Sequence, residues 1–210
     1  NLHVVGYSTA VDVSLSLDEL QEHLHSLPDK PEAIPYVTSY YSDRWGFCLT
    51  HLQRAALVPD TYRAVIRARK FQGVMNYAEL IIPGESSKEV FLSTYICHPS
   101  MANNEVSGPS VLTFVAKWLQ SAPRHFTYRL VFLPETIGAI YYLSQHLEHL
   151  RQHVHVGFNI SCVGDDRNYS FVSSRKGQTL ADRIASHILP ILSPSYVRHS
   201  FLERASDERQ

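Results

Sequence analysis

Two short apolar runs with a helical pattern between them restrict the fold of this chain more than any other feature. Residues 90–96 and 128–133 are too short for helices and read as strands buried on both faces, as in a parallel sheet. A third strand is expected over 154–163. Strands that alternate with helices predict an open α/β sandwich.

The helices are predicted from apolar residues at helical spacing. Pro109 fits the first turn of one helix, and a second begins near Ile137. Thr179 opens a third helix. The residues expected to be buried on these helices are Val111, Leu112, Val115, Trp118 and Leu119, then Ile140, Leu143, Leu147 and Leu150, and then Leu180, Ile184, Ile188 and Leu189.

The first third of the chain has a different pattern of residue types. Ser16 and Glu19 form a capping box that predicts a helix over 17–26, before Pro28. Aromatic and β-branched residues then predict strands over 36–41, 61–67 and 74–82, and a turn at Pro83 and Gly84 ends this stretch. This region therefore reads as a small β-rich unit, with Trp45 and Phe47 inside.

Composition excludes several classes of protein. A hydrophobic content of 44% and a net charge of -1 argue against a disordered chain and against a partner that is nucleic acid or an anionic membrane. The three cysteines form no CxxC pair, which favours a reducing compartment. With no long apolar run and no signal peptide pattern, a cytoplasmic protein with a small or neutral partner is expected.

Polar residues follow two of the predicted strands. Because ligands gather beyond the carboxyl ends of strands in open α/β sheets, His98 and Glu135 are expected to lie near one another. Imidazole and carboxylate bind zinc, and a further carboxylate can take a proton from an attacking water. These residues, with Asn103, Asn104 and Glu105, therefore favour a metal-assisted hydrolase.

Plainer interpretations stand beside this one. His98 reads equally as a loop residue, and Glu135 as a charge placed near a helix N-terminus. Residues 103–105 read as a polar turn before Ser107, a helix cap, and residues 165–167 as either a turn or part of the site. The other prominent side chains are assigned structural roles: His146 and His149 to a solvated helix face, and Cys162 to the core as a small hydrophobe.

Five segments carry a more specific resemblance, namely residues 36–48, 94–109, 133–138, 162–166 and 206–210. They resemble the aminopeptidase-like proteins of unknown function linked with polysaccharide biosynthesis, a distant branch of the zinc aminopeptidases that include the bacterial leucyl aminopeptidases. The resemblance implies a three-layer α/β sandwich with a mostly parallel central sheet. It also implies domains at 1–33 with 84–210, truncated at both ends, and a β-rich insertion at 34–83.

The resemblance also implies roles for single residues. His98 matches the first zinc-binding histidine, and Glu135 matches the general base. The metal-bridging aspartate falls at Asn104, which leaves that duty to Asn104 or to Glu105. A second glutamate and a further aspartate of the family are replaced by Thr136 and Ser161, and a later histidine of the family lies beyond this chain. One zinc ion, weakly held or absent in a truncated chain, is therefore expected.

Two functions follow from these residues. The first is a zinc-dependent aminopeptidase-like hydrolase of amide or peptide bonds, with Asp207 or Glu208 holding the amine of a small peptide or aminoacyl-type substrate. The second is a non-catalytic binding or scaffold module of the same fold, associated with polysaccharide biosynthesis, which the substitutions at Asn104, Thr136 and Ser161 favour. Neither involves nucleic acid or a membrane, and both allow a homo-oligomer.

Overall fold

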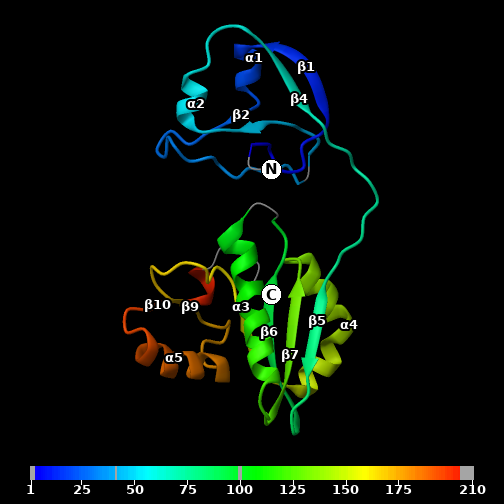
Figure 1. Ribbon diagram of the computed structural model, residues 1–210, viewed down its shortest axis with the longest axis vertical. Coiled ribbons are helices and arrows are strands. Elements are labelled where there is room, and N and C mark those ends of the chain that lie inside the picture. Colours follow the sequence, from blue (N-terminus) through cyan, green and yellow to red (C-terminus); the bar gives the residue numbers. More distant parts are fainter. Residues whose placement is uncertain (1–2, 41, 99–100, 204–210) are drawn as a thin grey trace. The chain divides into compact units, whose positions relative to one another are not determined.

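Strand pairing determines where the chain divides. A computed structural model describes residues 3–40, 42–98 and 101–203. Contacts separate two units, Asn1–Gly73 and Val74–Gln210 (Figure 1). The predicted domain boundaries lie after residues 33 and 83, and local patterns do not reveal which distant strands pair.

The first unit is built on one antiparallel strand pair. The strand β1 (Val11–Ser16) pairs with β4 (Thr61–Ile66), so the N-terminal segment shares a sheet with the predicted insertion. A second, shorter pair joins β2 (Leu24–His25) to β3 (Phe47–Cys48) in parallel. Both pairs surround a core of Leu20, Leu24 and Ala64, against which Trp45 and Phe47 pack as predicted.

Local rules predict the helix starts of this unit better than its strands. Ser16 caps α1 (Leu17–Gln21) in the expected capping box with Glu19. The helix ends before residue 26 because Leu24–His25 pairs with another strand. A helix not predicted, α2 (His51–Ala55), follows. Of the strand expected over 36–41, residues 36–40 form only a single bridge, from Thr38 to Gly6, and residue 41 lies outside the described residues.

The second unit contains a four-stranded sheet. Its strands are β5 (Ala78–Ile82), β6 (Ser86–Tyr95), β7 (Phe126–Leu133) and β8 (Val154–Asn159), in the order β5-β7-β6-β8. The strand β6 runs parallel to both neighbours, whereas β5 runs antiparallel to β7. The three strands expected to lie side by side therefore do so, within a mixed sheet.

Two helices cover opposite faces of this sheet (Figure 1). The helix α3 (Ala102–Gln120) packs Leu112 and Leu119 against Leu130, and α4 (Ile137–His153) packs Tyr142 against Val131. Neighbouring residues of a strand point to opposite faces, so Leu130 and Val131 serve different cores.

The buried faces of these helices differ from the predicted ones. On α3, Val111 and Trp118 are exposed, and on α4, Ile140 and Leu147 are exposed. For α3 the cause is Gly108, where a Cβ would lie 2.3 Å from Thr94 Oγ1. The helix approaches the sheet along the face of this glycine, whereas Val111 and Trp118 face away. Pro109 is also inside α3 and not in its first turn, because the helix begins at Ala102.

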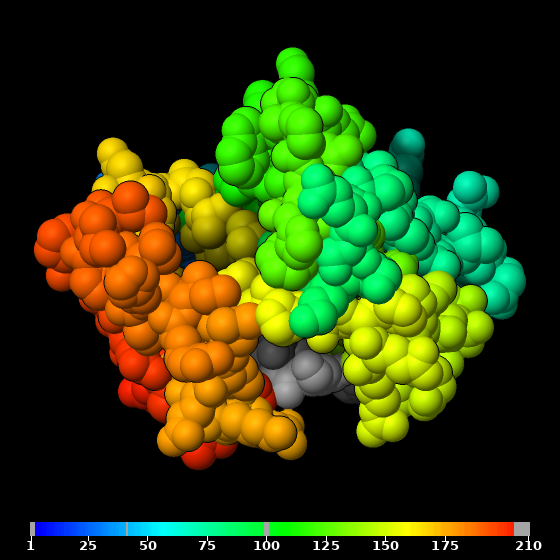
Figure 2. Space-filling model, turned by 90° about the horizontal axis from the view of Figure 1, so that it is seen from below, coloured from blue at the N-terminus to red at the C-terminus, as the bar shows by residue number. Residues whose placement is uncertain are grey.

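The C-terminal part adds a smaller layer. Its elements are β9 (Ser170–Val172), α5 (Leu180–Leu192), β10 (Val197–His199) and the 3-10 turn η1 (Phe201–Glu203), and β9 and β10 pair in parallel. Figure 2 shows α5, in orange, at the surface. The predicted inner residues Ile184 and Ile188 are exposed, and Asp182 is buried in their place. None of the helices in the described residues combines the length and apolar character that crossing a membrane requires.

A buried ionic cluster ties α4 to the sheet. Arg129 donates to both carboxylate oxygens of Glu89, at 2.7 and 3.0 Å, and also to Glu79 and Tyr142. His149 Nε2 lies 2.7 Å from Glu89, and its side chain is 42% exposed, so this histidine is part of the predicted solvated face and also contacts the cluster. Although burial alone would raise it, hydrogen bonds from Arg129 and His149 lower the pKa of Glu89.

Candidate functional site

Two strand ends bring the candidate site together. Tyr95 at the end of β6 pairs with Leu133 at the end of β7, and the amide of Ile96 donates to the Leu133 carbonyl at 3.0 Å. The segments that follow therefore leave the sheet side by side. His98 Nε2 lies 3.7 Å from Glu135 Oε2, and both side chains are about four-fifths buried, at 22% and 18% exposure. These two residues thus lie at the same edge of the sheet.

Glu135 is held by an unusual turn. Thr136 has φ 55° and ψ -75°, and the amide of Ile137 donates to the Glu135 carbonyl at 2.7 Å. A hydrogen bond across three residues with these angles is the strained form of the γ-turn. Gly138 completes the turn, since a Cβ there would lie 2.6 Å from Pro134. Glu135 therefore directly precedes the N-cap residue of α4, so its position near a helix N-terminus is also the one that the plainer interpretation predicted.

Glu105 approaches the same point from α3. Its side chain is buried, and one carboxylate oxygen accepts a hydrogen bond from the Cys97 amide at 2.5 Å. The other oxygen, Oε1, is buried without a hydrogen-bond partner, and so is Oδ1 of the neighbouring Asn104. Buried polar atoms without partners are rare and commonly mark a missing ion or water. The alternative of a polar turn is wrong here, because residues 102–107 are helical.

Cys97 is the site residue that sequence reasoning missed. One donor atom from each of Cys97, His98 and Glu105 lies within 4.8 Å of the other two. The sulfur accepts a hydrogen bond from the Glu135 amide at 3.0 Å. Burial raises the pKa of the Cys97 thiol to about 12, despite this hydrogen bond, and the charges of Glu105 and Glu135 add to the rise. The free thiol is therefore protonated at neutral pH, which argues against a cysteine nucleophile.

The loop after β8 is attached to the start of α3. Gly164 donates its amide to Asn103 Oδ1 at 2.7 Å, and Asn103 donates to Asp165 at 3.1 Å. Asp165 also forms a salt bridge with Arg167, which holds its pKa at about 2. Residues 165–167 therefore brace the site from outside. Cys162 is exposed, with φ 51°, so its prediction as a core residue is wrong.

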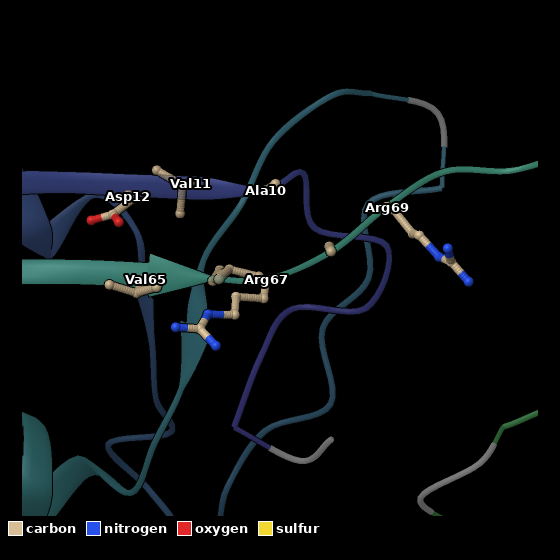
Figure 3. A pocket seen from close by; sticks show the side chains of 8 residues that line it. Ala10, Val11, Asp12, Val65, Arg67 and Arg69 are labelled. Atoms are coloured by element: carbon tan, nitrogen blue, oxygen red, sulfur yellow. The ribbon is translucent and has the colours of Figure 1, made fainter.

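The remaining predicted residues lie elsewhere. Asp207 and Glu208, expected to hold the substrate amine, are outside the described residues. A surface hollow in the first unit lies at the ends of β1 and β4, where Figure 3 shows Asp12, Arg67 and Arg69 with charged ends that do not converge. Convergent polar groups are the mark of a ligand site, so this hollow does not compete with the strand ends of the second unit.

Comparisons with known proteins identify relatives of this chain. Residues 10–210 match the family described as a domain of unknown function (DUF4910). A Clostridium acetobutylicum protein named "putative polysaccharide biosynthesis protein with aminopeptidase-like domain" is 39% identical over all 210 residues, which are 48% of its own length. A crystal structure titled "putative peptidase", also from Clostridium acetobutylicum, superposes with a TM-score of 0.93 at 39% identity, over this whole chain and 50% of that one. The chain spans about half the length of these relatives.

Proposed function

Since the chain belongs to the DUF4910 family, a family of unknown function, we propose from the site itself that the protein is a zinc-dependent hydrolase of amide bonds. The observation that carries the proposal is the buried, partnerless Oε1 of Glu105, a residue that groups with His98, which in turn lies beside Glu135. The relatives named for an aminopeptidase-like domain and a peptidase support this reaction class. The substrate is a small peptide or an aminoacyl-type compound, cleaved at its amino-terminal residue.

The donor types suit one zinc ion. His98 and Glu105 offer imidazole and carboxylate ligands, and Asn104, whose Oδ1 is also buried without a partner, directly precedes Glu105 in the chain. When bound, zinc supplies a Lewis acid that polarises the amide carbonyl and favours ionisation of the attacking water. Asn104 is a weaker donor than the aspartate that the aminopeptidase resemblance expects, which supports one ion and argues against two.

Glu135 serves as the general base. Its carboxylate lies 3.7 Å from His98 Nε2, on a turn that fixes its backbone. The water oxygen bonds to the carbonyl carbon, the carbon–nitrogen bond breaks, and Glu135 carries a proton from the water to the leaving amine. Asp207 or Glu208 holds the substrate ammonium group.

The finer points of the proposal follow from the same resemblance. The second unit would be the core of a three-layer sandwich with a mostly parallel sheet, as in zinc peptidases, and the protein would act in the cytoplasm, as a monomer or homo-oligomer, without nucleic acid or a membrane. The second candidate is a non-catalytic module of the same fold. It is favoured by Asn104, Thr136 and Ser161, which stand where the aminopeptidase resemblance expects acidic residues.

Two substitutions in the full-length protein test the proposal. His98→Ala should abolish both zinc retention, measured by elemental analysis, and hydrolysis of a panel of aminoacyl anilides and dipeptides. Glu135→Gln fills nearly the same volume but cannot take a proton, so it should keep zinc while turnover falls about 100-fold or more.

A matched control exists on the surface. His125 and Glu85 form a histidine–glutamate pair at 3.4 Å with both side chains exposed, so His125→Ala and Glu85→Gln should change neither zinc content nor turnover. Parental turnover in Glu135→Gln, or zinc loss as complete as in His98→Ala, would contradict the assigned base. A parent protein that neither binds zinc nor hydrolyses any substrate would be the non-catalytic module.

A further inference from the structure

The first evidence that Cys97 belongs to the metal site is its position. A donor atom of Cys97 lies within 4.8 Å of a donor atom of both His98 and Glu105. Zinc holds sulfur at about 2.3 Å and nitrogen or oxygen at about 2.0–2.1 Å, so the ligands of a tetrahedral site lie about 3.3–3.8 Å apart. Changes of roughly 1 Å, within the range of side-chain rotation, convert the observed group into that geometry.

The second evidence is the state of Glu105. Glu105 is a buried residue, only 7% exposed, and one of its carboxylate oxygens accepts a hydrogen bond from the Cys97 amide. The other oxygen has no partner in the described structure. A buried, ionisable oxygen left in this condition is destabilising, and a cation bound beside it removes the penalty. The unsatisfied oxygen therefore indicates that Glu105 binds a cation at this group and does not serve a purely structural contact.

The third evidence is the way the cysteine is fixed. Glu135 donates its backbone amide to the sulfur at 3.0 Å, and Glu105 accepts from the backbone amide of the same cysteine. Hydrogen bonds of this kind orient the ligands of metal sites and tune them. Both partners are residues of the proposed site, so an ion there would meet a sulfur that is already oriented.

We propose that Cys97 is a direct metal ligand, so that one ion is held by the thiolate of Cys97, the imidazole of His98 and a carboxylate oxygen of Glu105. This inference rests on the proposed function and deepens it. Three protein ligands with one open position are the pattern of catalytic zinc sites. Glu135 then stays outside the ligand set and acts as the base. Binding releases the thiol proton to solvent, and a soft sulfur ligand favours zinc or cobalt over magnesium or manganese.

Cobalt substitution tests the ligand directly, without an activity measurement. The full-length protein is stripped with a chelator and reloaded with Co²⁺, and a thiolate-to-cobalt charge-transfer absorption in the near ultraviolet is expected. Cys97→Ser, whose hydroxyl still accepts from the Glu135 amide, should lose this absorption and bind zinc at least about 10–100-fold more weakly. Cys162→Ser is the matched control, because this cysteine is exposed and lies outside the group, and it should keep both.

Thiol protection is the second measurement, and it needs no variant. Because the free Cys97 thiol is protonated and reacts slowly, alkylation is continued until the Cys97 peptide of the metal-free protein is modified, as read by peptide mass spectrometry. Over the same time, zinc should shield Cys97 but not Cys162. Cobalt bound without the charge-transfer absorption, or equal alkylation of Cys97 with and without zinc, would overturn the inference. If His98→Ala still abolished zinc binding in that case, the proposed hydrolase would stand with nitrogen and oxygen ligands only. A parent protein that binds neither metal would overturn both.

Discussion

The substitution Arg129→Met should lower the unfolding free energy of the second unit more than any surface substitution does. The Arg129 side chain is 6% exposed and that of Glu89 is 5% exposed, so the variant leaves a buried carboxylate with only His149 beside it. Breaking a buried ion pair from one side destabilises a protein by about 3–5 kcal/mol. For a protein of this size that corresponds to a fall in Tm of about 6–20 °C.

The pH dependence of this loss has a definite sign. In the parent, the pKa of Glu89 is lowered from its ordinary 4.5, so its stabilising contribution is present above that pH and is lost as the pH falls through the folded value. Without Arg129, burial dominates and raises the pKa of Glu89, so the variant regains stability on acidification. The difference in unfolding free energy between parent and variant should therefore be largest near neutral pH and shrink below about pH 5.

Thermal unfolding combined with hydrogen exchange measures this effect where it occurs. Peptides from β7 should lose protection in Arg129→Met, while peptides from β1 and β4, in the first unit, serve as an internal control. Arg63→Met is the matched variant, because Arg63 also contacts Asp12 through two hydrogen bonds but in an exposed pair, and its melting should hardly change. Equal effects of the two variants, or a difference that grows on acidification, would refute the reasoning.

Two further predictions concern the backbone around the site, both measured as unfolding free energy in urea. Gly108→Ala places a Cβ 2.3 Å from Thr94 Oγ1 and 2.4 Å from the Ile160 carbonyl, and should destabilise by about 1–3 kcal/mol, whereas Gly73→Ala, with open space around it, should not. Thr136→Gly should raise stability by about 1 kcal/mol, because relief of about 1–3 kcal/mol of strain exceeds the roughly 0.4–1 kcal/mol that glycine adds to unfolded-state entropy. A loss of stability in Thr136→Gly would show that the turn is not strained.

Local patterns predicted the elements of this chain more reliably than their burial. The strands β6, β7 and β8 and the caps at Ser16 and Thr179 depend on neighbouring residues, and the structure confirms them. The rotation of each helix depends on close approach to the sheet, and the apolar residues of α3 are spread around the helix. Gly108 decides that rotation through contacts with residues 94 and 160, which no window of helical periodicity includes.

In the candidate site, too, some features could be predicted from the sequence and others required the three-dimensional structure. The proximity of His98 and Glu135 follows from a general rule about strand ends, so it could be predicted. The participation of Cys97 and the buried environment of Glu105 could not, because they require the side-chain directions in the turn after β6 and in the first turn of α3. A cysteine directly before a predicted histidine ligand is the one indication of this role that the sequence contains.

The helices that begin at the candidate site differ from the other helices in their N-terminal capping. Three helices, α1, α2 and α5, begin with complete capping boxes, whereas α3 and α4, the two that begin at the site, have no side-chain cap. A side-chain cap stabilises a helix by about 1 kcal/mol, so α3 and α4 lack this stabilisation. The strained backbone of Thr136 destabilises the start of α4 by about 1–3 kcal/mol more. Glu135 lies one residue from the α4 N-cap position, yet its carboxylate is directed to His98 and its amide to Cys97. Local rules that hold elsewhere in the chain fail where polar groups converge, which is expected if these groups serve a ligand and not the helix.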